Sequence, residues 1–218
     1  MQRIKYRSAD RVLNEQIVAL LCECFGSQYR DYYLLQLEYL LSPSLTKILT
    51  DDEGRLSAFT QVVEYSLRIR ANDCPLKVAY LYSVCTAKSH QGQGVMSEFL
   101  PEIIKEINKA GYVATFLVPA EIWLIDYYKK FGFRWQTGVV YAKAPANAIP
   151  LISPCDDAKE YLREVAQYEK KREGQRQFEE HKHTEWLPLN PMPLGWMLQS
   201  LDPKIIIPSD IPLLQPLT

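Results

Sequence analysis

The chain has 218 residues, of which 47% are hydrophobic and 23% charged, as in a globular protein with one enlarged domain or a domain plus an appendage. Its formal net charge of −1 gives no global positive field to gather nucleic acid or an anionic membrane surface, so neither partner is expected. Because the chain also lacks a long apolar run and has no apolar block behind Met1, we expect a cytoplasmic protein without transmembrane segments.

Patterns in the N-terminal half predict a short strand, two helices and an antiparallel hairpin, in that order. The helices are indicated by apolar residues at helical spacing, which begin after the capping residue Asp10 and are interrupted at Gly26. The hairpin is indicated by two β-prone runs on either side of a polar turn that contains Gly54. The expected ranges are 4–7 for the first strand, 10–26 and 31–41 for the helices, and 45–50 and 56–69 for the hairpin strands.

The middle of the chain is predicted to alternate strands and helices, which gives an α+β fold. A long β-prone run ends at Thr86 and leads into a glycine-rich turn, and the apolar residues that follow repeat with helical period until Gly111. The expected ranges are 77–86 and 112–118 for strands, 93–110 and 121–131 for helices, and 133–142 for the last strands.

Composition changes after Ala144, so we expect one domain over residues 1–145 and a C-terminal extension over 146–218. Residues 156–183 are mostly charged and carry a thin apolar stripe, which favours a solvated helix. The proline-rich stretch 187–218 is predicted to form an extended strap, because prolines are excluded from regular central strands. Its apolar side chains should dock on the flank of the sheet or on a second subunit, and the latter would make a homo-oligomer.

The turn between the long strand and the next helix reads Gln91-Gly92-Gln93-Gly94. A strand, a glycine turn and a helix in this order present unpaired backbone N–H groups to an anion at the helix N-terminus. Glycine lets the backbone approach a ligand because it has no Cβ, and the helix dipole adds partial positive charge at the same point. The turn is therefore a candidate phosphate site, although a plain strand-to-helix connector would look the same.

Two motifs resemble those of the GNAT acetyltransferases. The segment from Gln91 to Met96 is similar to the family's CoA-binding motif, Arg/Gln-x-x-Gly-x-Gly/Ala, and departs from it at Met96, where the family prefers Gly or Ala. The segment from Tyr127 to Phe133 is similar to the family's Phe-Tyr-x-Lys-x-Gly-Phe signature. The similarity covers about residues 1–145 and looks most like the branch that contains the enhanced intracellular survival acetyltransferases.

The resemblance implies a GNAT-type fold, which is a mixed, mostly antiparallel sheet flanked by helices, and acetyl-CoA as co-substrate. In this family an amine attacks the thioester carbonyl directly, and a backbone N–H of the strand before the glycine turn stabilises the oxyanion. Tyr128 aligns with the tyrosine that protonates the leaving CoA thiolate, although an aromatic paired with Leu124 on a buried helix face would look the same. By position, the residues expected to bind acetyl-CoA are Val84, Cys85, Thr86, Gln91, Gly92, Gln93, Gly94, Val95 and Met96.

The sequence does not single out the general base that would deprotonate the amine. Glu38, Glu64 and Glu121 are candidates, each of which also suits a solvated surface carboxylate, and a water chain could serve instead. Cys85 would permit an acyl-cysteine intermediate, but no histidine lies near it in the sequence to activate the thiol. Direct transfer is therefore preferred.

No metal site is expected from the cysteines or histidines. The five cysteines are irregularly spaced, which argues against disulfides, and Cys22 and Cys24 lack a second pair of ligands. His181 and His183 lie in a charged segment without further ligands. Four tryptophans could line an aromatic cleft for a cationic acceptor or could pack in the core: Trp123, Trp135, Trp186 and Trp196.

The sequence therefore predicts an N-acetyltransferase that moves acetyl from acetyl-CoA to a primary amine of a small molecule or a peptide. The alternative is a non-catalytic CoA-binding module whose C-terminal strap contacts a partner protein. Tyr128 favours the enzyme and Met96 favours the alternative. Transfer of a longer acyl group also stays open, because the motifs do not define an acyl pocket.

Overall fold

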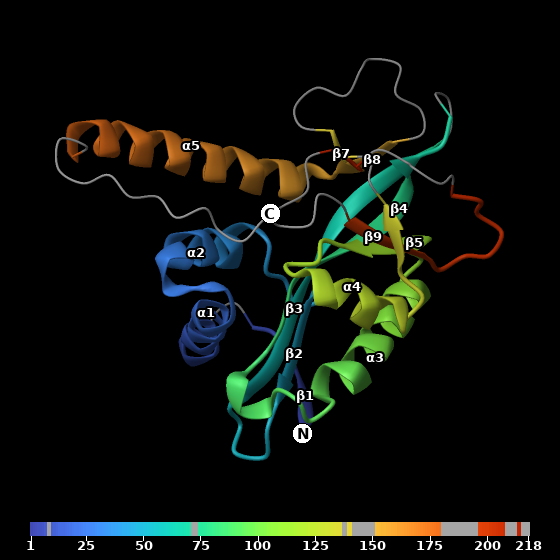
Figure 1. Ribbon diagram of the computed structural model, residues 1–218, viewed down its shortest axis with the longest axis horizontal. Coiled ribbons are helices and arrows are strands. Elements are labelled where there is room, and N and C mark those ends of the chain that lie inside the picture. The colour runs from blue at the N-terminus through green and yellow to red at the C-terminus, as the bar shows by residue number, and fades with distance from the viewer. Residues whose placement is uncertain are drawn as a thin grey trace.

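The computed structural model describes residues 1–7, 10–70, 74–136, 139–140, 151–179, 196–207 and 213–214. Within these ranges a mixed sheet of ten strands is flanked by helices on both faces (Figure 1). The helices are α1 (Arg11–Phe25), α2 (Arg30–Tyr39), α3 (Val95–Lys109), α4 (Ile122–Lys129) and α5 (Asp156–Glu179). The strands are β1 (Gln2–Lys5), β2 (Thr46–Thr50), β3 (Leu56–Arg68), β4 (Leu76–Thr86), β5 (Ala114–Leu117), β6 (Arg134–Gln136), β7 (Val139–Val140), β8 (Leu151–Pro154), β9 (Trp196–Ser200) and β10 (Leu213–Leu214).

The two longest strands, β3 and β4, form the centre of the sheet as an antiparallel pair. The strand order is β6-β9-β5-β4-β3-β8-β10-β7, and β2 and then β1 branch from β3. Among the described strands, β5 runs parallel to β4, and β10 runs parallel to β7 and β8, whereas the other pairs are antiparallel. This confirms the predicted mixed, mostly antiparallel sheet, and the β2–β3 pair is the predicted hairpin.

Local sequence signals explain where the first helix begins and ends. The Asp10 carboxylate accepts a hydrogen bond from the Leu13 backbone N–H at 3.0 Å, which satisfies one of the unpaired donors of the first turn of α1. Gly26 ends the same helix with a φ of 107°, a conformation that L side chains rarely adopt. Both residues act as the sequence predicts.

The sheet separates the hydrophobic core into two sides, and helices cover each side. On one side, α3 and α4 cover the sheet with the buried residues Val95, Phe99, Leu100, Ile103, Ile107 and Tyr128. On the other side, α1 and α2 cover the first strands, and α5 covers the sheet beyond them (Figure 1). Any ligand that reaches the middle of β4 must therefore enter past one of these two helical layers or at the end of the sheet.

The C-terminal extension is part of the sheet. Strand β8 pairs with β3, and β9 lies between β5 and β6 with hydrogen-bonded partners on both sides. The prediction that prolines keep this region out of the central sheet is wrong for Trp196–Ser200, because the residues of β9 contain no proline and bury an apolar face. This segment does contact the sheet, but as a strand within it and not on its flank as predicted.

The charged segment 156–179 forms the predicted helix, α5. It packs against α2, where the Tyr168 hydroxyl donates to the Asp31 carboxylate at 2.5 Å and Tyr32 contacts Glu169. Among the described residues, no helix combines the length and the apolar character needed to cross a membrane.

Candidate active site

The pairing of β4 with β5 ends well before the glycine-rich turn. Its parallel pairing with β5 ends at Tyr80, opposite Phe116, whereas β4 itself continues to Thr86. The last residues of β4 therefore pair with β3 on one side, whereas their edge on the β5 side has no strand partner among the described residues; we call this unpaired edge the gap toward β5. Such an edge can bind an extended ligand through backbone hydrogen bonds.

A β-bulge interrupts β4 at the same place. Its register against β3 shifts between the pairs Gln61–Tyr82 and Phe59–Cys85, so two residues of β4 oppose one residue of β3. Ser83, inside the bulge, has a φ of 55°, a left-handed value that is unusual for a residue with a side chain. Strained backbone of this kind costs about 1–3 kcal/mol and is concentrated at functional sites.

The bulge is supported from the α2 side by a buried side chain. Gln36 is 1% exposed, and its Oε1 lies 3.3 Å from the Ser83 Oγ. Its Nε2 is buried and has no hydrogen-bond partner among the described residues. Neither feature is visible in the sequence, because Gln36 and Ser83 are 47 positions apart.

The Gln91–Gly94 turn connects β4 to α3 and has the geometry that the sequence predicts. Gly92 and Gly94 have φ values of 75° and 78°, and no described atom lies within 4 Å of a Cβ built on either residue. Gly94 is the N-cap of α3 and offers no side-chain hydrogen bond to the first helical turn. The first backbone N–H groups of α3 are therefore free to bind an anion, and the dipole of α3 favours one there.

The two glutamine side chains of the turn stabilise its backbone conformation through hydrogen bonds. The Gln91 Nε2 donates to the Thr86 carbonyl at 3.0 Å, and the Gln93 Nε2 donates to the Ser89 carbonyl at 2.8 Å. Both amides thus fasten the turn to the segment that precedes it. The donors available for a phosphate are those of the backbone, with two glycines leaving the space in front of them open.

The two hydrophobic residues after the turn point toward the core. Val95 is buried, and Met96 packs against the side-chain cluster that α3 and α4 share. The methionine in place of the Gly or Ala of the resembling motif therefore directs its side chain into the core. It leaves the described glycine turn open.

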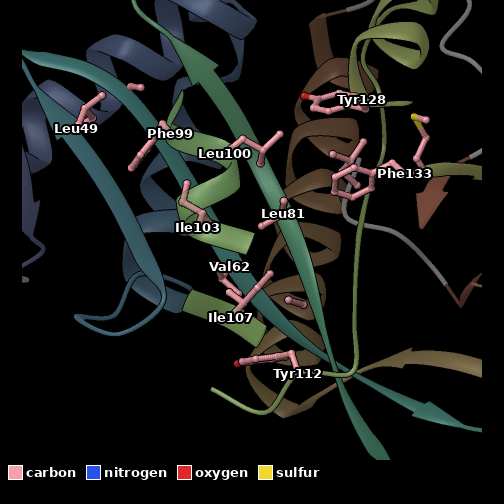
Figure 2. Close-up of a cluster of buried hydrophobic side chains, with 14 of the residues drawn as sticks. Leu49, Val62, Leu81, Phe99, Leu100, Ile103, Ile107, Tyr112, Tyr128 and Phe133 are labelled. Carbon is pink, nitrogen blue, oxygen red and sulfur yellow. The ribbon is translucent and has the colours of Figure 1, made fainter. Parts of the chain in front are cut away.

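Tyr128 belongs to the same cluster as Val84 and Met96, so the fold brings it to the side of β4 that faces α3 and α4. Its side chain is 5% exposed, and its ring lies 5.9 Å from that of Phe133 in an edge-on arrangement. Figure 2 shows both rings at one end of the cluster, with Tyr112 at the other end. Burial raises the pKa of Tyr128 well above its ordinary value, and Tyr127 and Cys85 add to the rise, so the phenol keeps its proton at neutral pH.

The end of β4 alternates between the two sides of the sheet. Val84 packs toward α3 and α4, whereas Cys85 packs toward α1, where its Sγ lies 3.7 Å from the Phe59 carbonyl. Burial raises the pKa of the Cys85 thiol well above its ordinary value, which disfavours the nucleophilic thiolate. The side chain of Cys85 is thus a core residue, while the backbone of Val84–Thr86 runs along the gap toward β5.

Each candidate base either has another hydrogen-bond partner or is exposed. The Glu64 carboxylate accepts a hydrogen bond from the Tyr112 hydroxyl at 2.8 Å and pairs with Lys77, at the far end of α3 from the glycine turn. Glu121 accepts from the Trp123 indole at 2.6 Å, and Glu38 is exposed on α2. Sequence position alone could not separate these surface roles from a catalytic one.

The tryptophans do not gather into one cleft. Trp196 is fully buried in the sheet core, Trp135 is half-buried, and Trp123 is exposed. Trp186, His181 and His183 lie outside the described residues. Within the described ranges, no group of three or more His, Cys, Asp or Glu side chains could hold a metal ion.

Comparisons with solved structures find the same fold. The aminoglycoside 6'-acetyltransferase type Ii is 13% identical and matches 93% of this chain and 99% of its own length, with a TM-score of 0.53. A GCN5-related N-acetyltransferase from Kribbella flavida is 14% identical over 63% of this chain and 34% of its own, with a TM-score of 0.50. Eis1 from Mycobacterium abscessus is 13% identical over 63% of this chain and 32% of its own, with a TM-score of 0.48. The chain thus spans about a third of the length of the last two proteins.

The more specific likeness to the enhanced intracellular survival branch stays a prediction, because a fold match at this level does not separate branches. No curated protein matches the sequence. The family model of the acetyltransferase (GNAT) domain matches residues 5–136, which include β4, the glycine turn, α3 and α4. The chain therefore belongs to the GNAT acetyltransferase family.

Proposed function

We propose that this acyltransferase moves the acetyl group of acetyl-CoA to a primary amine of a small molecule or a peptide by direct attack. The observation that carries the proposal is the continuity of three features along one stretch of chain. The bulged edge of β4 runs into the glycine turn, and the turn opens α3, whose side of the sheet holds the buried Tyr128.

The diphosphate of acetyl-CoA would bind at the start of α3. The fit is supported by the open space at Gly92 and Gly94 and by the free backbone N–H groups of the first helical turn. The pantetheine arm carries amide groups and would extend along the free edge of β4, as an added strand does. The thioester would then lie near the Val84–Thr86 backbone, beyond the end of the β4–β5 pairing.

The reaction would start when the neutral amine attacks the thioester carbon. A C–N bond forms, the carbonyl oxygen becomes an oxyanion, and a backbone N–H of the Val84–Thr86 segment stabilises that charge. When the C–S bond breaks, the electron pair leaves with sulfur, and Tyr128 gives its proton to the CoA thiolate. The phenol of Tyr128 carries its proton at neutral pH, as the role requires, whereas its raised pKa makes it a weaker acid and does not itself support the role. The tyrosinate left behind regains a proton from solvent.

The amine loses its own proton to solvent or to a water chain. This part of the proposal is supported by the positions of Glu38, Glu64 and Glu121, which lie on surfaces or in other contacts. Direct transfer is supported over an acyl-cysteine intermediate by the buried, protonated state of Cys85.

The test is a screen of primary amines with acetyl-CoA, in which the release of free CoA thiol is measured. We expect release that depends on both the amine and the protein. Binding of CoA without release for any amine would favour the alternative, a non-catalytic CoA-binding module. Absence of both binding and release would exclude both functions.

A further inference from the structure

The helix α4 begins with two exposed apolar side chains. Ile122 is 70% exposed and Trp123 is 61% exposed. Several large hydrophobic side chains are exposed among the described residues, and of these only Trp123 is aromatic. Because a tryptophan can contribute a large contact area, the exposed indole beside Ile122 offers an apolar surface that a ligand can cover.

The Trp123 ring is held in place although it is exposed. Its Nε1–H donates to the Glu121 carboxylate at 2.6 Å, and its ring packs edge-on against Tyr127 with 6.5 Å between the ring centroids. A side chain that is already ordered loses little conformational entropy when a ligand binds to it. The indole is therefore suited to serve as a platform.

The platform is connected to the phosphate site. The Tyr127 hydroxyl lies 3.3 Å from the Ser97 Oγ, and Ser97 is in the first turn of α3, just after Gly94. The exposed indole, the Tyr127 ring and the first turn of α3 thus form one continuous surface on the α3 and α4 side of the sheet.

We propose that the Trp123 indole stacks on the adenine ring of CoA. This inference rests on the proposed function. In CoA the adenine is joined through one ribose to the diphosphate that would bind at α3, so it must lie within a short reach of that turn. The adenine ring is uncharged, whereas the ribose next to it carries the 3′-phosphate of CoA, so the ring and not the ribose would lie beside the Glu121 carboxylate.

Stacking of a base on an aromatic side chain is lost when the side chain is replaced by alanine, with a loss of affinity of about 5- to 140-fold. The experiment compares the wild type with Trp123→Ala, Trp123→Phe and the control Ile122→Ala, which removes the neighbouring exposed apolar side chain. Each protein is titrated calorimetrically with CoA and with 4′-phosphopantetheine, which keeps the arm and one phosphate but lacks the adenosine. Thermal unfolding confirms that every variant is folded.

We expect Trp123→Ala to lower the affinity for CoA by about 5- to 140-fold and Trp123→Phe to retain most of the wild-type affinity. The affinity of Ile122→Ala should stay within about twofold of the wild type. Binding of 4′-phosphopantetheine should be the same for all four proteins. An equal loss for both ligands would place Trp123 on the arm, and unchanged CoA binding by Trp123→Ala would show that CoA does not stack on it. Either result overturns the inference while leaving CoA binding established. If the wild type binds neither ligand, the proposed function fails instead.

Discussion

The Oε1 of Gln36 on α2 lies 3.3 Å from the Oγ of Ser83 in the bulge of β4. This contact joins the helical layer on one side of the sheet to the strand segment that opens the gap toward β5. The other end of the Gln36 amide, the Nε2, is buried without a described partner. A buried polar atom without a partner costs about 1–3 kcal/mol, so this contact is retained at an energetic cost.

The replacement Gln36→Leu removes that unsatisfied atom and keeps a side chain of similar size. We expect the free energy of unfolding to stay unchanged or to rise by up to about 2 kcal/mol, because the cost of the buried amide disappears. Urea denaturation followed by fluorescence measures the free energy of unfolding. A loss of more than about 1 kcal/mol would mean that the lost hydrogen bond from Ser83 outweighs the cost of the unsatisfied Nε2.

The tail strand β9 gives a second prediction, on stability. Trp196 is fully buried and packs against Phe116 of β5, with 5.5 Å between the ring centroids. We expect Trp196→Ala to lower the free energy of unfolding by about 3–5 kcal/mol, because the large side chain leaves a cavity in the core. The matched control in the same tail is Ile206→Ala, because Ile206 is 83% exposed. This replacement should change the free energy of unfolding by less than about 0.5 kcal/mol. Equal stability of the two variants would argue against β9 as a central strand.

Buried tyrosines predict how stability depends on alkaline pH. Burial raises the pKa of Tyr80, Tyr128 and Tyr161 above the ordinary value of about 10. The unfolded chain therefore binds fewer protons than the folded chain above pH 10, and stability falls as pH rises from there. At pH 11, about one unit above the pKa in the unfolded chain, each of these residues should cost on the order of 1 kcal/mol. Denaturation at pH 8 to 11, with tyrosinate absorbance as a second signal, measures the effect; full ionisation of these tyrosines near pH 10 in a folded protein would refute it.

Tyr128→Phe tests the acid of the proposed reaction. Only the hydroxyl is lost, so the ring still packs on Phe133 and the fold should persist. We expect kcat to fall by about 10²- to 10⁴-fold, because general-acid help disappears when the thiolate leaves, while the Kd for acetyl-CoA stays nearly constant. Steady-state kinetics with the best amine and a CoA titration of both proteins separate the two effects. An unchanged kcat in a reaction limited by chemistry would remove Tyr128 from the mechanism.

The parts of the fold that the sequence predicts are those with local causes. The cap at Asp10, the stop at Gly26, the hairpin around Gly54 and the apolar face of α3 each depend on neighbouring residues, and the structure has them all. The glycine turn is predicted for the same reason, since its geometry follows from Gly92 and Gly94 themselves.

The parts that the sequence does not predict depend on contacts between distant segments. Proline content indicates an extended tail, yet the proline-free stretch Trp196–Ser200 pairs with β5 and β6 because its apolar residues complete the core there. The bulge at Ser83 and its contact with Gln36 arise from pairing across the sheet and packing of α2. The sequence leaves Glu64 as one of three candidate bases that also suit a surface carboxylate, and only the fold shows its hydrogen bond with Tyr112.

The central claim is that the turn before α3 binds the diphosphate of acetyl-CoA. Gly94→Glu places a side chain and a negative charge there, and the matched control Gly111→Glu does so at the opposite end of α3. Both glycines have left-handed φ values, 78° and 86°, and open space around a Cβ, so the cost of backbone strain should be similar, about 1–2 kcal/mol.

Calorimetric titration with acetyl-CoA is the direct measurement. The wild type and Gly111→Glu should bind with similar affinity, and Gly94→Glu, shown to be folded by its thermal transition, should give no binding heat. Binding of acetyl-CoA by Gly94→Glu as tightly as by the wild type, or no heat with the wild type itself, would contradict the account.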